Sequence, residues 1–380
     1  MVTFQIVKLG KVVNFVNEKI ETSKINLENY ISTENLLPNK SGIVDATTLP
    51  KINKVNHFVE EDVVFSNIRT YFKKVWFCKF EGGASNDILI FRPVDTDILD
   101  KRFLYYVISS DSFIGYTVAS SKGTKMPRGD KEAMKVFEFR LPLINTQRKI
   151  ASLLSSYDDL IENNEKRIMI LEEMAQLLYT EWFVKFKFPG HEKVKLVDSG
   201  TEFGLIPEGW EIKNVDSLIK RIPVGKKYEN KSVFEMGKVP VLDQGKTGLI
   251  GYHNDEPGVK ASTKNPVIVF ANHTCYQNII VFPFSAIQNV LPFIPNDERH
   301  IIWLHWATKD LIKFNDYKGH WPEFMSKKLI IPDVELTKKF GNIVGRYVEM
   351  RYKLETINKN LSQIRDLLIP QLVTGKRELK

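Results

Sequence analysis

The stretch NNEKRIMILEEMAQLLYTEWF, from Asn163 to Phe183, is the strongest indication of the fold, because its pattern predicts part of one unusually long helix. It contains no helix breaker, and an apolar residue recurs every three or four positions with charged residues between them. The pattern begins near Thr146, so we expect a helix of about 38 residues, roughly 55 Å long. That length exceeds the need of one small domain core and predicts a spacer between two domains.

Apolar residues along this helix follow alternating steps of four and three, the heptad pattern of a coiled coil. A second helix with Asp333 as its expected N-cap keeps the same alternation near the C-terminus. The alternative, in which each helix packs only on its own domain, is disfavoured by their length. We predict that the helices pack on each other, antiparallel if a pseudo-two-fold axis relates them. The expected contact residues are Ile150, Leu154, Tyr157, Ile161, Asn164, Ile168, Leu171, Ala175, Leu178 and Trp182 in the first helix, and Ile343, Tyr347, Met350, Leu354, Ile357, Leu361, Ile364 and Leu368 in the second.

Three segments recur in the same order in the two halves of the chain. VFSNIRTY (64–71) matches VFANHTCY (269–276), QIVKLGKVV (5–13) aligns loosely with EIKNVDSLI (211–219), and LPLINTQRKIASLLSSY (141–157) aligns with IPDVELTKKFGNIVGRY (331–347). Each half is therefore a globular segment, a proline and a long helix. The sequence predicts an α+β fold in which two long antiparallel helices, forming a coiled coil, hold two repeated domains apart.

Short β-rich runs punctuated by turn residues build the globular segments. We expect strands within 62–68, 74–80, 87–93, 266–272 and 278–284, and helices within 102–118 and 299–314. The expected domains are 1–143, the central helix 144–184, a linker 185–206, the second domain 207–332, and the C-terminal helix and tail 333–380.

The net charge of +8 and the sequence pI of about 9.1 favour an acidic partner, nucleic acid first and a membrane surface second. No apolar run is long enough for a membrane span and the N-terminus lacks a signal-peptide core, which predicts a cytoplasmic protein with no membrane partner. Cys78 and Cys275 are expected to be buried thiols because two distant cysteines form no disulfide framework.

Catalytic signatures are incomplete. LDQGKTG (242–248) has the Gly-Lys-Thr end of a phosphate loop, but Pro240 stands where its first glycine is needed. FEGGAS (80–85) lacks the glycine spacing of a cofactor turn, and the Pro-Pro of an amino-methyltransferase site is missing. His273 and Cys275 have no second ligand pair, so we expect no metal site. The residues favour a binding protein, without catalytic residues or a cofactor of its own.

The segment from Leu141 to Gly190 resembles the central conserved region of the specificity subunits of type I restriction–modification enzymes. RDLLIPQLVTGKREL (365–379) is similar to that family's C-terminal ending, and LIPEGWEI (205–212) to the opening of its target-recognition domains, an opening that the first half lacks. The residues that match the central pattern are Pro142, Gln147, Ile150, Ala151, Asp158, Ile161, Leu178, Tyr179, Trp182 and Phe183.

The resemblance implies a non-catalytic subunit whose two target-recognition domains each read one half of a split double-stranded DNA sequence. It also implies two methylation subunits, which bring S-adenosylmethionine, and two restriction subunits, which bring ATP-driven translocation and Mg²⁺-dependent cleavage. Two alternatives stay open. One is a single-chain restriction–methylation enzyme, and the other is a coiled-coil adaptor without a role in DNA binding.

DNA contacts are expected from lysine and arginine toward phosphates, and from polar or aromatic side chains in loops after strands toward bases. Asn67/Asn272 and Tyr71/Tyr276 recur in both halves, so a structural turn is their alternative role, since different half-sites should not be read by identical residues. The candidates are Asn67, Arg69, Tyr71, Lys73, Lys74, Lys122, Lys125 and Arg128 in the first domain, and Lys226, Lys227, Lys246, Asn272, His273, Tyr276, Gln277, Lys318 and His320 in the second.

Overall fold

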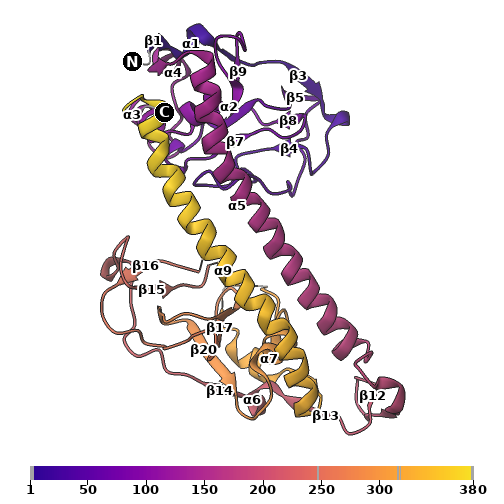
Figure 1. The fold of residues 1–380 in the computed structure, drawn as a ribbon. Coiled ribbons are helices and arrows are strands. Elements are labelled where there is room, and N and C mark those ends of the chain that lie inside the picture. The colour runs from indigo at the N-terminus through magenta and orange to yellow at the C-terminus, as the bar shows by residue number, and fades with distance from the viewer. Residues whose placement is uncertain (1–3, 246–247, 315, 317, 378–380) are drawn as a thin grey trace. The chain divides into compact units, whose positions relative to one another are not determined.

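A computed structural model of the chain describes residues 4–245, 248–314, 316 and 318–377. It divides into two compact units, one made of Met1–Asn163 with Asn358–Lys380 and the other of Asn164–Ile357. Each unit contains one globular domain and a part of both long helices (Figure 1). Among the described residues, no helix combines the length and the apolarity needed to cross a membrane.

The globular domain of the first unit mixes small sheets and short helices. Its elements are β1 (Gln5–Lys8), α1 (Leu9–Val12), β2 (Val13–Phe15), β3 (Lys19–Glu21), β4 (Tyr30–Ile31), β5 (Lys54–Phe58), β6 (Val63–Ser66), β7 (Val75–Phe77), β8 (Gly82–Ala84), β9 (Ile88–Pro93), α2 (Lys101–Ile108), α3 (Asp111–Ala119), α4 (Lys131–Val136) and β10 (Glu138–Leu141). The strands form the sheets β2-β9-β6-β7 and β3-β5-β8-β4 and the antiparallel pair β1-β10.

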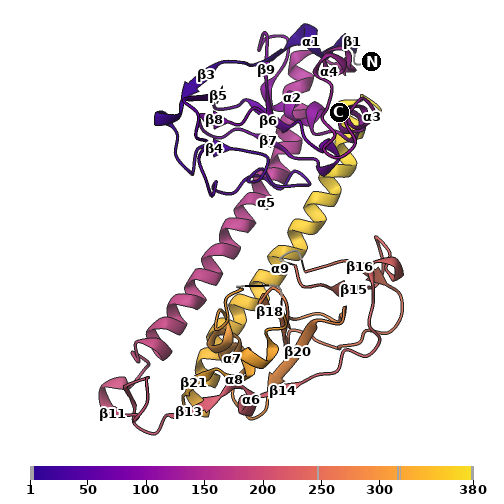
Figure 2. The ribbon, with the colours of Figure 1, turned by 180° about the vertical axis from the view of Figure 1, so that it is seen from behind.

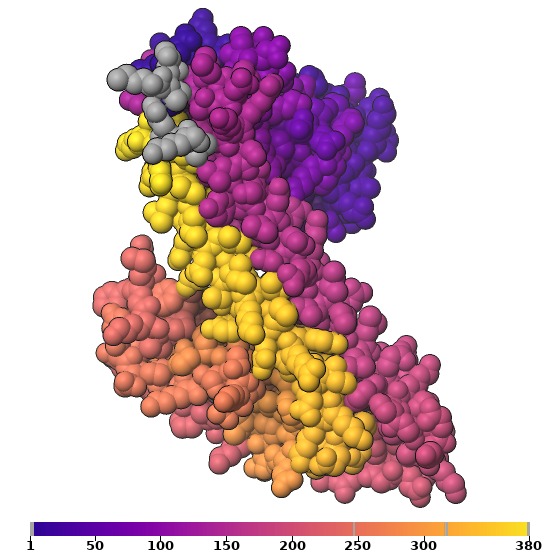
Figure 3. Space-filling model, in the orientation of Figure 1, coloured from indigo at the N-terminus to yellow at the C-terminus, as the bar shows by residue number. Residues whose placement is uncertain are grey.

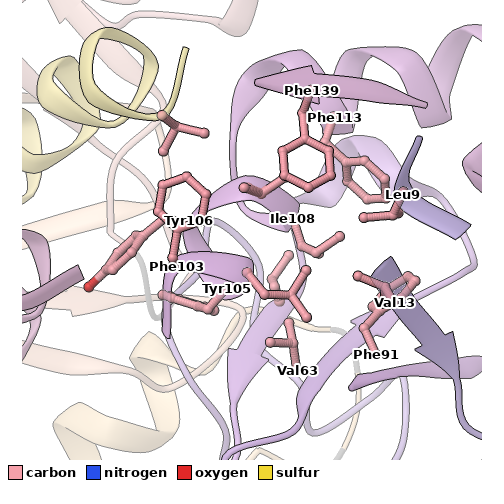
Figure 4. Close-up of a cluster of buried hydrophobic side chains, with 14 of the residues drawn as sticks. Leu9, Val13, Val63, Phe91, Phe103, Tyr105, Tyr106, Ile108, Phe113 and Phe139 are labelled. Atoms are coloured by element: carbon pink, nitrogen blue, oxygen red, sulfur yellow. The ribbon is translucent and has the colours of Figure 1, made fainter. Parts of the chain in front are cut away.

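The core of this domain lies between the sheet β2-β9-β6-β7 and the helix α2, which contacts β6, β7 and β9. All four residues of β6 are buried, as expected for a strand covered on both faces. Figure 4 shows Phe91 from the sheet, Phe103 from α2 and Phe113 from α3 converging on this cluster. Each fully buried phenylalanine contributes about 1.5–3 kcal/mol to folding.

The second unit repeats this arrangement. Its elements are β11 (Leu196–Asp198), β12 (Leu205–Pro207), β13 (Glu211–Asn214), α6 (Val215–Leu218), β14 (Ile219–Arg221), β15 (Val239–Leu242), β16 (Gly251–His253), β17 (Val267–Ala271), β18 (Gln277–Ile280), β19 (Ser285–Ala286), β20 (Val290–Pro295), α7 (Ile301–Thr308), α8 (Trp321–Ser326) and β21 (Lys328–Ile331). The sheet β14-β20-β17-β18 has the strand order of β2-β9-β6-β7, and α7 contacts it as α2 does its counterpart (Figure 2).

The predicted repeat is confirmed. The two octapeptides begin within β6 and β17, the matching inner strands of the two four-stranded sheets. The second pair of segments forms β1-α1-β2 and β13-α6-β14, and in each unit the first of these strands pairs antiparallel with the strand that precedes a long helix. The five predicted strands and the helices α2, α3 and α7 are present.

The long helices are α5 (Ile144–Tyr179), continued by a π-helical turn over Thr180–Val184, and α9 (Val334–Val373). The predicted N-cap of α9 is confirmed, because the amide of Leu336 donates to Asp333 Oδ1 at 2.9 Å. Inside the first unit Asp158 of α5 contacts Arg365 of α9, and inside the second Glu172 contacts Arg351. From the first of these contacts to the second, the residue number increases on α5 and decreases on α9, which confirms the antiparallel pairing.

The contact face of α5 is as predicted, with Ile150, Leu154 and Ala175 buried and the polar Asn164 buried among them. The prediction for α9 was half wrong. Tyr347, Leu354, Leu361 and Leu368 are buried or half-buried, but four predicted residues are 39–46% exposed, namely Ile343, Met350, Ile357 and Ile364.

Val344, Arg351, Asn358 and Arg365 take the places of those four residues against α5. Arg351 and Arg365 can occupy the contact face because each forms an ion pair with a carboxylate of α5 there. The apolar residues Ile343, Met350, Ile357 and Ile364 are left exposed to solvent. Figure 3 shows atoms of α9, in yellow, at the molecular surface.

A polar residue in the first turns of each long helix fastens the globular domain of its unit. Gln147 Oε1 accepts from the amide of Asp100, the N-cap of α2, at 2.9 Å, while its Nε2 donates to two backbone carbonyls. Thr337 Oγ1 likewise accepts from the amide of His300, the N-cap of α7, at 3.1 Å. Both side chains are fully buried, so each domain is set on its helix by hydrogen bonds as well as by packing.

Candidate nucleic-acid interface

In the first domain, two segments that are distant in sequence lie side by side and carry all eight predicted DNA contacts. The amide of Arg69 donates to the carbonyl of Pro127 at 2.8 Å, and the amide of Gly129 to that of Asn67 at 3.1 Å. We call residues 67–74 and 122–128 the first-domain loop cluster. The segment around Asn39 lies beside this cluster, because the amide of Asn39 donates a hydrogen bond to the carbonyl of Phe72.

Three exposed cations of the first-domain loop cluster are paired with carboxylates at its edge. Lys73 Nζ lies 2.7 Å from Asp111, Lys122 Nζ 2.5 Å from Asp130, and Arg128 Nη2 3.0 Å from Asp87. The hydrogen bond from Lys73 is the main cause that holds the pKa of Asp111 below its ordinary value. Exposed ion pairs are worth only about 0–1 kcal/mol, so these cations can exchange their carboxylates for DNA phosphates at little loss.

The other residues of the first-domain loop cluster differ in their surroundings. Tyr71 is half exposed, with its ring tilted against that of Phe72, and Lys125 is exposed. Asn67 is buried, with its side-chain oxygen against Gly129, so its position fits the structural-turn alternative. Lys74 donates to the carbonyl of Thr33, and burial lowers its pKa.

In the second domain, the loop after β17 meets the segment before α8. Asn272 Oδ1 accepts from the amide of Trp321 at 2.8 Å, which again fits a structural role for the repeated asparagine. The amide of His273 donates to Gln244 Oε1 at 2.9 Å, and Tyr276 is half-buried. Lys318 is half exposed, and its Nζ lies 3.4 Å from Oδ1 of Asp316, two residues earlier in the chain.

Two further lysines of the second domain, Lys226 and Lys227, are exposed in the loop after β14. Lys226 contacts Asp255 at 2.8 Å and lies over the ring of Tyr228. Lys246 lies outside the described residues.

The structure removes Gln277 and His320 from the candidate DNA contacts, because both are buried. Gln277 donates to the carbonyl of His305 at 2.9 Å and to the hydroxyl of Thr308 at 3.1 Å, which joins β18 to α7. His320 is fully buried, and its Nε2 lies 3.1 Å from the carbonyl of Asp316. Both side chains hold neighbouring segments in place, and residue type alone does not distinguish this structural role from DNA binding.

Several residues at the interface were not predicted from the sequence. Asp87, Asp111 and Asp130 neutralise the loop cations, and Thr33 and Met126 line a cavity beside Arg69. They come from segments that only the fold brings together, and no spacing in the sequence links them.

A buried Ser285–His253 pair in the second domain is the arrangement nearest to a catalytic one. His253 Nδ1 accepts from the amide of Asp255 at 3.0 Å, so its proton lies on Nε2, 2.9 Å from Ser285 Oγ. Burial lowers the pKa of His253, which keeps the ring neutral. A histidine that donates to a serine cannot take its proton, and we assign the pair a structural role. Among the described residues, no group of three or more histidine, cysteine, aspartate or glutamate side chains could hold a metal ion.

Comparison with known proteins places the chain beside one family. Residues 1–173 match the model of the type I restriction modification DNA specificity domain. The specificity subunit of the type I restriction enzyme MjaIX of Methanocaldococcus jannaschii is 25% identical over 309 residues, 74% of this chain and 70% of that protein. The HindI specificity subunit of Haemophilus influenzae is 22% identical and covers 91% of this chain and 94% of its own length.

The fold has a counterpart among solved structures. The type I restriction–modification S subunit from M. genitalium superposes with a TM-score of 0.58 at 16% identity, over 100% of this chain and 97% of that one. At this identity the match concerns the fold.

Proposed function

The chain belongs to the family of type I restriction–modification specificity subunits, and we propose that its two domains each read one half of a bipartite double-stranded DNA target. The observation that carries this proposal is the duplication of one domain plan with different loops. The sheet orders agree, whereas the loop after β6 contains a 3₁₀ turn and the described, shorter loop after β17 (residues 272–276) does not. One scaffold with two loop sets suits two different half-sites.

The positive charge of the loops supports DNA as the ligand. Exposed cations that can bind phosphates are Lys73, Lys122, Lys125 and Arg128 in the first domain, and Lys226, Lys227 and Lys318 in the second. With the chain's net charge of +8, they predict an affinity that falls steeply with salt.

Specificity subunits of this family act in a complex, and we propose two methylation and two restriction subunits as the partners of this chain. The exposed apolar residues Ile343, Met350 and Ile357 of α9, with Met169, Met174 and Leu177 of α5, all in the second unit, are the residues that we assign to them. On this proposal S-adenosylmethionine, ATP and Mg²⁺ bind to the partner subunits, and the complex acts in the cytoplasm. The single-chain enzyme and the adaptor without a DNA role are not favoured, because the relatives are specificity subunits.

The decisive experiment maps methylated adenines across the genome of the source organism with and without this gene. We expect one bipartite motif, two short specified blocks around an unspecified spacer, to lose its methylation when the gene is deleted. An unchanged methylation map, in cells that produce the chain and its methylation subunits, would contradict the proposal.

A further inference from the structure

The first-domain loop cluster encloses a cavity of about 210 Å³. Its lining combines the polar residues Arg69, Lys74 and Ser66 with the apolar residues Phe72 and Met126. Sites for whole small molecules measure roughly 300–1,000 Å³, so this cavity fits a ligand of about the size of one base edge.

The two cations of the cavity lack the carboxylate partners that their neighbours have. Arg69 makes one long side-chain hydrogen bond, from Nη2 to the carbonyl of Lys125 at 3.4 Å, and its buried Nε has no partner. Lys74 is held by the carbonyl of Thr33. Lys73, outside the cavity, is paired with Asp111. Glu34 partly compensates the charge of Lys74, because its attraction opposes the lowering of the Lys74 pKa by burial. The donors of Arg69 are those that a ligand with acceptor atoms would satisfy.

The backbone of this loop is held in an unusual conformation. Arg69 has φ = +49° and Lys73 has φ = +54°, on either side of the turn Thr70–Phe72. Side chains other than glycine rarely adopt this left-handed region, and such residues concentrate at functional sites.

We propose that this cavity receives the edge of one base of the first half-site and that Arg69 is a specificity-determining residue that reads guanine through N7 and O6. The inference rests on the proposed DNA-reading function and assigns it to a residue. Guanine offers two acceptors at the spacing of the guanidinium fork, the commonest specific contact in the major groove. A phosphate is a poorer ligand, because it would lose water against Phe72 and Met126.

The test compares Arg69→Gly and Arg69→Lys with wild type, using the full chain produced together with its methylation subunits. Glycine suits φ = +49°, so Arg69→Gly removes the side chain without threatening the fold, which thermal unfolding verifies. Lysine keeps the charge but loses the fork. The matched control is Glu61→Gly, since Glu61 is also left-handed (φ = +68°) but lies at the opposite end of β6 from the cavity.

Binding is measured on DNA libraries in which each half-site is randomised in turn. We expect wild type to prefer guanine at one position of the first block, and both Arg69 variants to lose that preference by about 5- to 150-fold. Preferences in the second block, and all preferences of Glu61→Gly, should stay as in wild type.

Other outcomes overturn the inference. If Arg69→Lys retains the guanine preference and Arg69→Gly weakens all sequences equally, Arg69 contacts a phosphate. If both variants select the wild-type sequence, the cavity reads no base, and the proposed function stands without this assignment. If wild type itself selects no bipartite sequence, the proposed function falls with the inference.

Discussion

His305 is completely buried in α7 of the second unit, where its ring lies against Trp306. Burial, more than the nearby Lys309 and Arg351, lowers the pKa of this histidine to about 3. Gln277 Nε2 lies 3.3 Å from His305 Nδ1 and donates to the His305 carbonyl. The neutral ring is therefore the form that the folded unit accepts.

This burial predicts a loss of stability in acid. Between the ordinary histidine pKa of 6.5 and the folded value of about 3, the unfolded chain binds one more proton than the folded chain. Stability from this site is complete above pH 6.5 and falls by up to about 1.4 kcal/mol per pH unit below it. We expect His305→Asn to flatten the dependence of the unfolding midpoint on pH between 6.5 and 4.

Tryptophan fluorescence during thermal unfolding at several pH values measures this slope. His191→Asn, at a partly exposed position of the same unit, is the control and should keep the wild-type slope. A His305→Asn variant with the wild-type slope would show that other groups cause the acid sensitivity.

At the scale of elements, a buried polar contact joins both long helices to the first domain. Arg365 Nη1 of α9 lies 2.7 Å from Asp158 Oδ1 of α5, and Tyr106 of α2 donates to Asp158 Oδ2 at 2.5 Å. Arg365 and Asp158 are only 9% and 18% exposed. A buried pair of this kind fixes which turns of the two helices face each other, although well-packed apolar residues could be as stable.

Breaking this pair should therefore be costly, and replacing it whole should not. Asp158→Ala is expected to lower the free energy of unfolding by about 1–3 kcal/mol. Tyr106 and the buried Arg365 both lose their contact with Asp158, and among the described residues Arg365 keeps only the exposed Asp366 as a carboxylate partner. Asp158→Leu combined with Arg365→Met should recover most of the loss.

Guanidinium-induced unfolding measures both effects. Glu61→Ala, which removes an exposed ion pair with Lys101, is the matched control and should change stability by less than about 1 kcal/mol. Equal losses for Asp158→Ala and Glu61→Ala would contradict the assigned importance of the buried pair.

The contact face of α9 allows a test with two adjacent residues. Val344 is fully buried and Ile343 is 39% exposed. Val344→Ala should lower the free energy of unfolding by about 1–3 kcal/mol through lost burial and a residual cavity. Ile343→Ala should change it by less than about 0.5 kcal/mol. If chemical denaturation shows a larger loss for Ile343→Ala than for Val344→Ala, the contact face of α9 is the one that the heptad pattern predicted.

For the whole molecule, the exposed apolar residues of α9 give a prediction about assembly. Ile357 is 46% exposed and belongs to the surface that we assign to partner subunits. Ile357→Lys should leave the free energy of unfolding within about 0.5 kcal/mol of wild type but reduce co-purification with the methylation subunits, because a charge replaces apolar contact area. Lys353→Ala, also exposed on α9, is the control. If Ile357→Lys co-purifies as well as wild type, the assembly surface lies elsewhere on the chain.

The site was less predictable than the fold. Arg69, Lys122 and Arg128 were chosen because loop cations can bind DNA, and the structure does bring their segments together. Residue type could not reveal that Gln277 and His320 face inward, or that Asp87 and Asp111 neutralise their neighbours. Those facts depend on which loops meet, and the loops meet through backbone hydrogen bonds that carry no sequence signature.

Sequence patterns alone predicted the two long helices, the repeated domain plan, the strands at the repeated octapeptides and the cap at Asp333, because periodicity, repetition and capping are local signals. Local signals could not reveal that Val344 is buried in place of Ile343, that Arg365 is buried, or that Arg351 is half-buried. The physical reason is that burial of a charged residue depends on its partner, and Glu172 and Asp158 become the partners only when the helices pair antiparallel.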